Sequence, residues 1–392
     1  MVPRGWLSMG ALAVLLILSV AARADDMAAL SNFAAAKIVI GQADFTSGDC
    51  NQGSDVPAAN NLCVPEGAPS RRKGRLYIPD SSDNRVLGFN KVPKKSDAPA
   101  NFVLGQPDLS TANFGLPPSA STFQFPARLA TAGKKLFVVD FGNSRVLIWN
   151  KLPSVTGTPA DVVVGQPDFT SNSPSTTQSG LNLPEGITVA GGKLFVSDRN
   201  NNRILIWNSI PTVNDAPADV VVGQKDFISS APAKPPTQAG FNEPEGLWSD
   251  GKRLAVADSS NNRVLIWNNI PAVNGAPADV VMGQADFTSN DIAEPPDAQS
   301  LGQPADVSSD GKRLFVADRD NSRVLVYQPF PTTNQPAATK VLGQSDFTHG
   351  EPNAGGAISA RGLESPIGIS FSRGELFVTD TDNSRVLVFS AK

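Results

Sequence analysis

Three glutamates at equivalent positions of the sequence could act together as one binding or catalytic site. Glu66, Glu185 and Glu245 each stand in a Pro-Glu-Gly triplet. The same position in three further copies of the triplet holds an uncharged residue: Ala127, Ala305 and Ile367. Three carboxylates that converge would repel each other unless something compensates their charge. Ca²⁺ accepts such oxygen ligands, so the pattern predicts either a cation site or three solvated glutamates.

Other catalytic residue types are scarce. His349 is the one histidine of the chain, and a zinc site of the histidine-rich kind needs several. No Gly-x-Ser-x-Gly nucleophile elbow and no Gly-rich phosphate loop occurs. The composition therefore favours a binding protein over an enzyme, with no cofactor expected apart from a possible Ca²⁺ ion at the glutamates.

The two cysteines, Cys50 and Cys63, lie 13 residues apart, and the chain has no others. In an exported protein such a pair predicts a disulfide. Two free thiols are the alternative. A metal site is disfavoured because neither a Cys-x-x-Cys pair nor a neighbouring histidine is present.

Residues 1–24 have the pattern of a secretory signal peptide. Arg4 supplies a positive start, residues 6–20 are mostly apolar, and Ala22-Arg23-Ala24 is a cleavage pattern that puts the mature start at Asp25. An uncleaved N-terminal anchor is the alternative. No later stretch is apolar enough to cross a bilayer. We therefore expect a periplasmic or secreted protein, residues 25–392, without a transmembrane segment.

The charge balance is acidic. Without Arg4 and Arg23 the 33 basic residues become 31, against 37 acidic ones, a net charge of −6. This acidic net charge does not favour binding to nucleic acid. One basic cluster stands out: Arg71, Arg72, Lys73, Arg75, Lys91, Lys94 and Lys95. It could meet an anionic partner or lipid headgroups, or serve solubility only.

Two sequence tags recur six times with one period. The first is an Asp-x-x-Asn-x-Arg turn, with Asp83 in place of the Asn in the first copy, and it recurs every 58 to 62 residues. Its Asp and Arg residues are Asp80, Arg85, Asp140, Arg145, Asp198, Arg203, Asp258, Arg263, Asp318, Arg323, Asp380 and Arg385. The second is Gly-Gln-x-Asp, which begins at Gly41, Gly105, Gly165, Gly223, Gly283 and Gly343. A shared period indicates a repeat architecture.

Each repeat has four short apolar segments joined by turns. In the third repeat these are residues 186–190, 193–198, 203–208 and 219–224. Val, Ile, Leu, Phe and Trp dominate, as in strands. The third segment is apolar on both faces, which predicts burial on both faces. Four-stranded sheets stacked around an axis meet this requirement, so we predict an all-β, six-bladed propeller.

The two ends of the chain have complementary defects. Residues 37–42 match the fourth strand of a blade with no blade before it, and the last repeat, residues 366–389, lacks a fourth strand. We predict that the N-terminal strand completes the last blade. Ring closure of this kind leaves no unpaired inner edge.

The core Leu-Phe-Val-x-Asp-x-x-Asn-x-Arg-Val/Ile-Leu resembles NHL repeats, which build six-bladed propellers. The resemblance covers nearly the whole chain after the signal segment. It implies the fold and leaves function open, since NHL propellers include RNA binders, protein-interaction modules and lyases. The glutamates also resemble metal ligands of gluconolactonase-type propellers. Those enzymes add Asn and Asp around the metal, whereas this chain has Ala127, Ala305 and Ile367.

Residues that all repeats share are expected to be structural, and residues that differ are expected to carry function. The turn Asp and Arg residues, the tag glutamines and the aromatic series ending the third segments belong to the first class. The long linkers, residues 46–64, 110–125, 170–183, 228–243, 288–303 and 348–365, differ most. We therefore predict a monomeric, non-catalytic scaffold that binds a protein, peptide or glycan through these linkers. The alternative is a Ca²⁺-dependent lactonase-like hydrolase with an acidic channel mouth.

Overall fold

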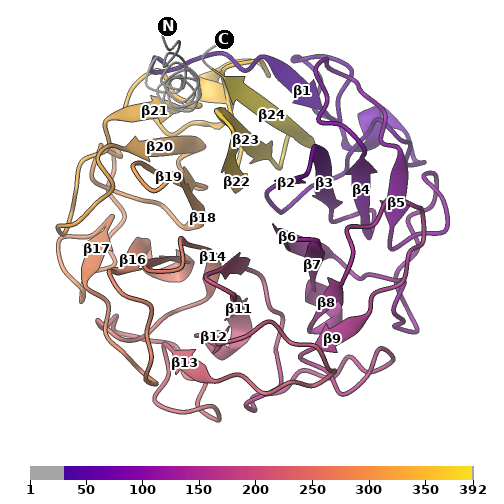
Figure 1. The fold of residues 1–392 in the computed structure, drawn as a ribbon. Helices are drawn as coiled ribbons and strands as arrows, with labels where there is room; N and C mark the ends of the chain where they lie inside the picture. The colour runs from indigo at the N-terminus through magenta and orange to yellow at the C-terminus, as the bar shows by residue number, and fades with distance from the viewer. Residues whose placement is uncertain (1–30, 391–392) are drawn as a thin grey trace, which may run out of the picture.

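The computed structural model describes residues 31–390. The predicted signal segment, residues 1–24, lies outside the described residues. Within them, the chain forms six four-stranded antiparallel sheets arranged as blades around one axis (Figure 1). The predicted all-β six-bladed propeller is confirmed.

Five blades are built from consecutive strands, and the sixth takes its outer strand from the N-terminal end of the described chain. The strands of blades one to three are β2 (Ser70–Arg72), β3 (Arg75–Asp80), β4 (Arg85–Phe89), β5 (Phe102–Leu104), β6 (Pro126–Ala132), β7 (Lys135–Asp140), β8 (Arg145–Trp149), β9 (Val162–Val164), β10 (Ile187–Ala190), β11 (Lys193–Asp198), β12 (Arg203–Trp207) and β13 (Val220–Val222). Those of blades four to six are β14 (Pro244–Ser249), β15 (Leu254–Asp258), β16 (Arg263–Trp267), β17 (Val280–Met282), β18 (Pro304–Ser309), β19 (Leu314–Asp318), β20 (Arg323–Tyr327), β21 (Lys340–Leu342), β22 (Pro366–Ser372), β23 (Glu375–Asp380), β24 (Arg385–Ser390) and β1 (Ile38–Ile40).

Ring closure follows the prediction. Strand β1 pairs antiparallel with β24, with Val39 opposite Leu387, and the two strands lie side by side in Figure 1. Val39 and Ile40 are fully buried. The first strand therefore contributes both backbone hydrogen bonds and apolar contacts to the last blade.

The hydrophobic core is divided into six parts, each shared by two neighbouring blades. The cluster between blades two and three, for example, joins Phe137 and Ile148 to Leu194 and Trp207. The aromatic residues that end the third strands are buried in these clusters: Phe89, Trp149, Trp207, Trp267, Tyr327 and Phe389. This explains why the third strands are apolar on both faces.

The recurring Asp–Arg turn ties each blade to both of its linkers. In blade three, Arg203 Nε donates to Asp198 Oδ2 at 2.7 Å, and both side chains are fully buried. The other oxygen of Asp198 accepts the backbone N–H of Asn182, in the linker that enters the blade. Arg203 also donates to the carbonyls of Gly180, in the same linker, and Phe227, in the linker that leaves. All six turns have this ion pair, at 2.6–2.7 Å.

The turns themselves are short 3-10 segments or β-turns that end in a left-handed residue. The 3-10 segments of the described chain are η2 (Cys50–Gly53), η3 (Phe141–Asn143), η4 (Arg199–Asn201), η5 (Ser259–Asn261) and η6 (Pro352–Gly355). η3, η4 and η5 are turns of this kind, whereas η2 and η6 lie in linkers. Asn202, before the turn arginine, has φ +51°, a conformation that Asn tolerates better than most residues.

The Gly-Gln-x-Asp tag begins each long linker. Gly165 has φ +93°, and a Cβ there would lie 2.5 Å from Leu181 Cδ1, so only glycine fits. The amide of Gln166 donates to the carbonyls of Ser144 and Ser173. The tag therefore fastens the start of the linker to the turn of its own blade.

The ring has two different faces. The Asp–Arg turns and the long linkers lie together on one face, which we call the linker face. The connections between first and second strands, such as Gly191–Gly192, lie at the opposite end of the strands. We call that side the hairpin face.

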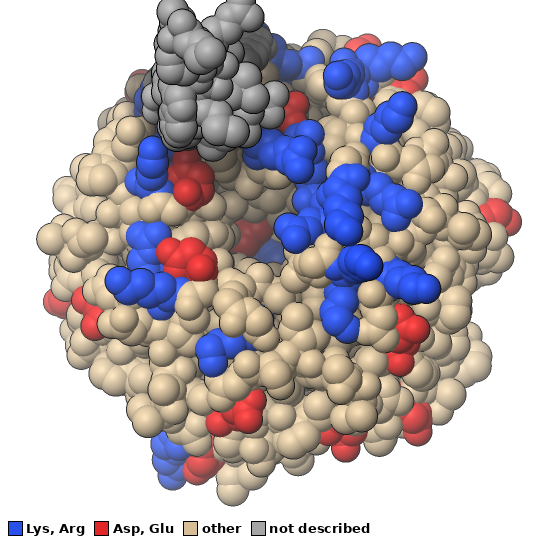
Figure 2. All heavy atoms as spheres, viewed as in Figure 1, with Lys and Arg blue, Asp and Glu red and all other residues tan. Residues whose placement is uncertain are grey.

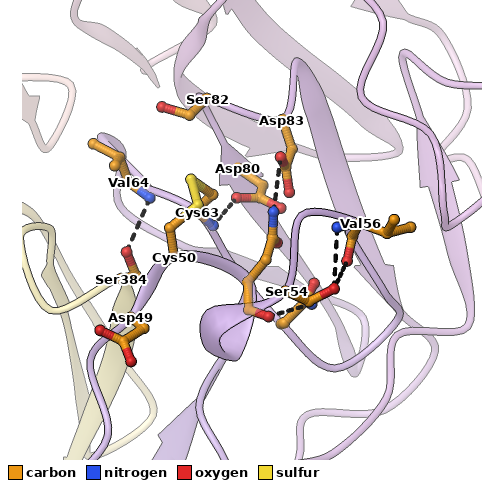
Figure 3. Close-up of a disulfide and its surroundings, with 12 residues drawn as sticks. Asp49, Cys50, Ser54, Val56, Cys63, Val64, Asp80, Ser82, Asp83 and Ser384 are labelled. Carbon is orange, nitrogen blue, oxygen red and sulfur yellow. Dashed lines mark hydrogen bonds between the residues drawn. A yellow bond between two sulfur atoms is a disulfide. The ribbon is translucent and has the colours of Figure 1, made fainter.

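The predicted disulfide is present: Cys50 and Cys63 are joined in the first linker (Figure 3). Cys63 N–H donates to Asp80 Oδ1 at 2.7 Å, and Val64 N–H donates to Ser384 Oγ. The crosslink therefore stabilises the linker at the junction of blades one and six. Closing a loop of this length contributes roughly 3 kcal/mol in the chain-entropy model.

Among residues 31–390, no helix has the length and apolar character needed to cross a membrane.

Deleting residues 37–42 should open the ring. Losing the buried apolar side chains of Val39 and Ile40 alone costs about 3–6 kcal/mol, and β24 is left as an unpaired edge. We expect a lower melting temperature and aggregation by size-exclusion chromatography and light scattering. A synthetic peptide of residues 31–48 should restore the monomer, whereas a shuffled peptide should not. An unchanged melting temperature with a monomeric profile would refute closure by β1.

Candidate functional site

The blades stop being equivalent where their innermost strands begin. The residue after the glutamate position is glycine in four blades: Gly67, Gly186, Gly246 and Gly368. A Cβ on Gly67 or Gly186 would lie 1.9 or 2.1 Å from a carbonyl oxygen of the next blade, so neither position accepts a side chain. Blades two and five, which lie opposite each other in the ring, carry Arg128 and Asp306 instead.

Arg128 crosses the axis of the propeller. From blade two, its Nη1 donates to Glu185 Oε1 in blade three at 2.8 Å. Its Nη2 donates to the carbonyls of Ala305 in blade five, at 2.9 Å, and Ile367 in blade six, at 3.2 Å. Its Nε lies 3.8 Å from Asp306 Oδ2. This arginine, only 3% exposed, therefore occupies the axis and closes the channel at this level.

The three glutamates come together around Arg128, but arginines accompany them. Arg319 Nη1 donates to Glu245 Oε1 at 3.0 Å. Arg199 Nη1 lies 3.6 Å from Glu185 Oε2. The carboxylate of Glu66 forms no hydrogen bond or ion pair with the described residues, although its backbone N–H donates to Ser81 Oγ. We call the six charged residues Glu66, Arg128, Glu185, Arg199, Glu245 and Arg319 the channel mouth.

The charge compensation expected from a cation is supplied here by guanidinium groups. Arg128, Arg199 and Arg319 stand among the carboxylates that Ca²⁺ would need as ligands, and their positive charges oppose a second cation. Within residues 31–390, no group of three or more His, Cys, Asp or Glu side chains is arranged to hold a metal. The donor set therefore does not fit the cation site predicted for Glu66, Glu185 and Glu245.

The three arginines stand at other positions of the repeat than the glutamates, so a comparison of the glutamate position alone does not reveal them. Arg199 and Arg319 each follow the turn aspartate, where the other blades have Ser81, Phe141, Ser259 and Thr381. Arg128 replaces a glycine that four blades share. Both departures from the repeat are visible in the sequence and could have been found by aligning the six turns and the six triplets.

The channel mouth contains carboxyl groups with unusual protonation. Burial, followed by the charge of Glu185, raises the pKa of Glu66 to about 7. The same two causes raise the pKa of Glu245 to about 7. Outside the mouth, burial also raises the pKa of Asp306, beside Arg128, to about 6. The mouth therefore changes its proton content close to neutral pH.

A groove adjoins the channel mouth on the linker face. It has a volume of about 570 Å³ and lies between the linkers that enter blades four and five, within the usual range of small-ligand sites. Its lining is rich in amide and hydroxyl groups: Lys234, Pro235, Pro236, Asn242, Ser260, Asn262, Thr288, Asn290, Ile292 and Gln303. We call it the amide groove.

Two side chains connect the amide groove to the mouth. Gln303 Oε1, in the groove, accepts a hydrogen bond from Arg319 Nη2 at 2.6 Å. Glu243 accepts from Arg199 Nη2 at 3.0 Å and from Ser260 Oγ at 3.3 Å. A ligand in the groove would therefore lie next to two arginines that are each about one-quarter exposed. The arrangement suits binding of a polar chain with a carboxylate near one end.

A second hollow lies on the other side of Arg128. This cavity of about 190 Å³ is lined by Arg128 and Asp306 together with side chains of the innermost strands, among them Thr131, Thr188 and Ser308. Because Arg128 lies between them, the cavity and the amide groove are separate.

The remaining sequence-predicted residues lie away from the mouth. The Asp–Arg turn pairs are buried beneath the linkers. His349 is half exposed, and its Nδ1 lies 2.7 Å from Asp346 Oδ1, a contact that raises the pKa of the histidine. The basic cluster lies on the hairpin face, where Arg71 pairs with Glu375.

Comparisons with known proteins identify the repeat. Residues 181–207 and 363–389 match the NHL repeat. None of the curated proteins matches the chain in sequence.

Solved structures resemble the fold at low sequence identity. A protein of unknown function from Bacteroides thetaiotaomicron is 11% identical, with a TM-score of 0.50, over 90% of this chain and 74% of that one. An auxiliary nutrient binding protein from the same organism is 12% identical, with a TM-score of 0.49, over 83% and 69%. Streptogramin B lyase is 13% identical, with a TM-score of 0.45, over 86% and 95%. At these identities the first match supports the fold alone.

Glu66→Gln should change how stability depends on pH. Between pH 4.5, the ordinary pKa of a glutamate, and about 7, the folded protein holds a proton on Glu66 that the unfolded chain releases. The free energy of unfolding therefore falls as pH rises through this window. The substitution should flatten the decline in melting temperature between about pH 5 and about pH 8. Glu294→Gln, on an exposed linker residue, is the control. Parallel pH curves for the parent and Glu66→Gln would refute a raised pKa for this half-buried, unpaired carboxyl.

Proposed function

We propose that this chain, an NHL-repeat six-bladed β-propeller, is an exported binding protein that takes a protein, peptide or glycan on its linker face. The observation that carries the proposal is the connection between the amide groove and the channel mouth. It lies on the face where the six blades differ most. Variable linkers on a rigid ring are a binding arrangement.

The chemistry of the groove favours an extended peptide among these ligands. Asn290 and Gln303 can donate to and accept from a peptide backbone, and none of the described residues that line the groove is aromatic. A sugar ring would lack a stacking surface there. At the end of the groove, Arg199 and Arg319 offer guanidinium groups for a carboxylate, either a chain terminus or an acidic side chain.

Two features support the proposal that the protein is exported. The disulfide between Cys50 and Cys63 is typical of oxidising compartments. The signal pattern in residues 1–24 agrees with it and remains a prediction from sequence. Together they favour a periplasmic or secreted location.

One observation favours a second candidate, a hydrolase. Glu66 is an unpaired carboxyl with a pKa of about 7, which suits a general acid or base. The Ca²⁺-dependent form of this candidate, resembling a lactonase, requires a metal at the mouth, and the arginine-filled donor set argues against it.

Ca²⁺ titration separates the two candidates. We expect chelator-treated protein and protein in saturating Ca²⁺ to melt at the same temperature, because guanidinium groups already neutralise the mouth. A bound ion would stabilise the fold by about 2.7 kcal/mol at a hundredfold excess over Kd. A rise that disappears in Glu185→Gln plus Glu245→Gln would place a cation at the mouth and favour the enzyme. A rise that persists would place the ion elsewhere.

The binding proposal can be tested with a displayed peptide library. Peptides selected on the parent protein should lose roughly tenfold or more in affinity for Asn290→Ala plus Gln303→Ala, since each replacement removes a hydrogen-bonding amide. Asn90→Ala plus Asn269→Ala removes two exposed amides from the hairpin face and should have no effect. Equal binding to all three proteins would refute the linker-face site. Glycan-array binding lost only in the groove variant would replace the peptide by a glycan.

A further inference from the structure

We infer that a hollow on the hairpin face, between blades one and two, binds an anionic ligand that carries phosphate or sulfate groups. The hollow has a volume of about 250 Å³ and is lined by Lys73, Arg75, Lys134, Lys151 and Leu152. Four of its five lining residues are cationic. We call it the basic hollow.

Both blades supply its walls. Lys73 lies in the connection between β2 and β3, and Arg75 is the first residue of β3. Lys134 lies in the connection between β6 and β7. Lys151 and Leu152 begin the loop after β8. Arg75 Nη1 donates to the Leu152 carbonyl at 2.9 Å, which fixes the guanidinium against blade two and forms the site before a ligand arrives.

The two hairpins are also joined directly. Arg72 Nε donates to the carbonyl of Gly133 at 3.3 Å. Arg72, Lys134 and Lys135 line a neighbouring hollow of about 480 Å³, so Lys134 is shared between the two depressions. A ligand with more than one anionic group could reach both.

The hairpins of blades four and five differ from this place because each contains an aspartate that pairs with its arginine. In blade four, Arg253 of the same hairpin pairs with Asp250 at 2.8 Å. In blade five, Arg313 pairs with Asp310 at 2.6 Å. The hairpins of blades one and two have no equivalent aspartate. Each cationic hairpin in blades four and five therefore brings its own counter-ion.

A carboxylate beside the blade-one hairpin is already paired. Glu375, from blade six, pairs with Arg71. None of the four cations of the basic hollow forms an ion pair with residues 31–390. Figure 2 shows that Lys and Arg side chains gather over blades one and two, with acidic groups at the margin, whereas blue and red groups lie side by side over blades four and five.

The lining selects the ligand chemistry. Lysines act as point charges for phosphate and sulfate oxygens, and the arginine adds directional donors. The protein as a whole is acidic, with 37 Asp and Glu against 33 Lys and Arg, so a general field does not draw anions to it. A volume of about 250 Å³ suits the charged group of a ligand better than a complete drug-sized molecule, which needs roughly 300–1,000 Å³.

This inference is independent of the proposed linker-face function. The basic hollow is on the opposite face, and none of its residues lines the amide groove. A failure of either experiment therefore leaves the other unaffected.

Isothermal titration calorimetry with sodium pyrophosphate tests the site at low and high salt. The parent should bind more weakly as salt rises. Replacing Lys73, Lys134 and Lys151 by Gln should weaken binding about tenfold in total at low salt. The control replaces Lys225, Lys252 and Lys312 by Gln, which removes the same charge from elsewhere on the ring and should leave binding unchanged.

Three outcomes would overturn the inference. Pyrophosphate could fail to bind the parent, or it could bind the parent and both triple variants equally. Alternatively, vesicles of phosphatidylglycerol and phosphatidylcholine could bind in flotation assays while pyrophosphate does not, which would make the surface a membrane contact. Sodium sulfate, tested beside pyrophosphate, distinguishes sulfate from phosphate as the group recognised.

Discussion

The buried Asp–Arg pair is the interaction on which the rest of this propeller depends. Its carboxylate accepts a hydrogen bond from a backbone N–H of the entering linker. Its guanidinium donates hydrogen bonds to backbone carbonyls of both the entering and the leaving linker. In blade five, Asp318 accepts the N–H of Gly302, while Arg323 donates to the carbonyls of Ser300 and Phe347. Because each charge has its partner and its remaining hydrogen bonds are supplied by backbone, the pair is tolerated inside the ring. Losing one partner of such a buried pair typically costs about 3–5 kcal/mol. The long linkers can therefore vary in sequence while their anchoring points stay the same.

The contrast between constant anchoring points and variable linkers explains which features could be predicted from sequence. The turn pair, the Gly-Gln-x-Asp tag and the alternation of apolar segments are local and repeated, so six copies reinforce one another. The blade count and the closure by residues 37–42 followed from such patterns, whereas the link between Cys50 and Cys63 followed from the short separation of the two cysteines and the export signal. The contacts of the channel mouth could not be predicted from such patterns, because they join residues far apart in the chain. Arg128 and Ala305, for example, are hydrogen-bonded across 177 positions.

The prediction of a cation at the glutamates depended on the same kind of comparison. It used like charges at one equivalent repeat position, those of Glu66, Glu185 and Glu245, and inferred that they need compensation. Their compensating groups stand at other positions of the repeat, after the turn aspartate and after the triplet's second residue. Reading each position separately hid the pairing. Comparing all positions at which one blade departs from the other five would have placed Arg199 and Arg319 beside the carboxylates.

Arg128 also separates the linker face from the hairpin face at the axis of the ring. A propeller with only glycine at this level would leave an open axis, and a ligand or ion could contact both faces. Here one side chain bonds to blades three, five and six and faces Asp306 from the opposite side of the ring. Two of its hydrogen bonds are accepted by backbone carbonyls, which do not titrate. Protonation of the glutamates changes the charge presented to the linker face, while the hairpin face has its own basic residues. The ring thus supports two chemically different surfaces on one scaffold, with Arg128 across the axis between them.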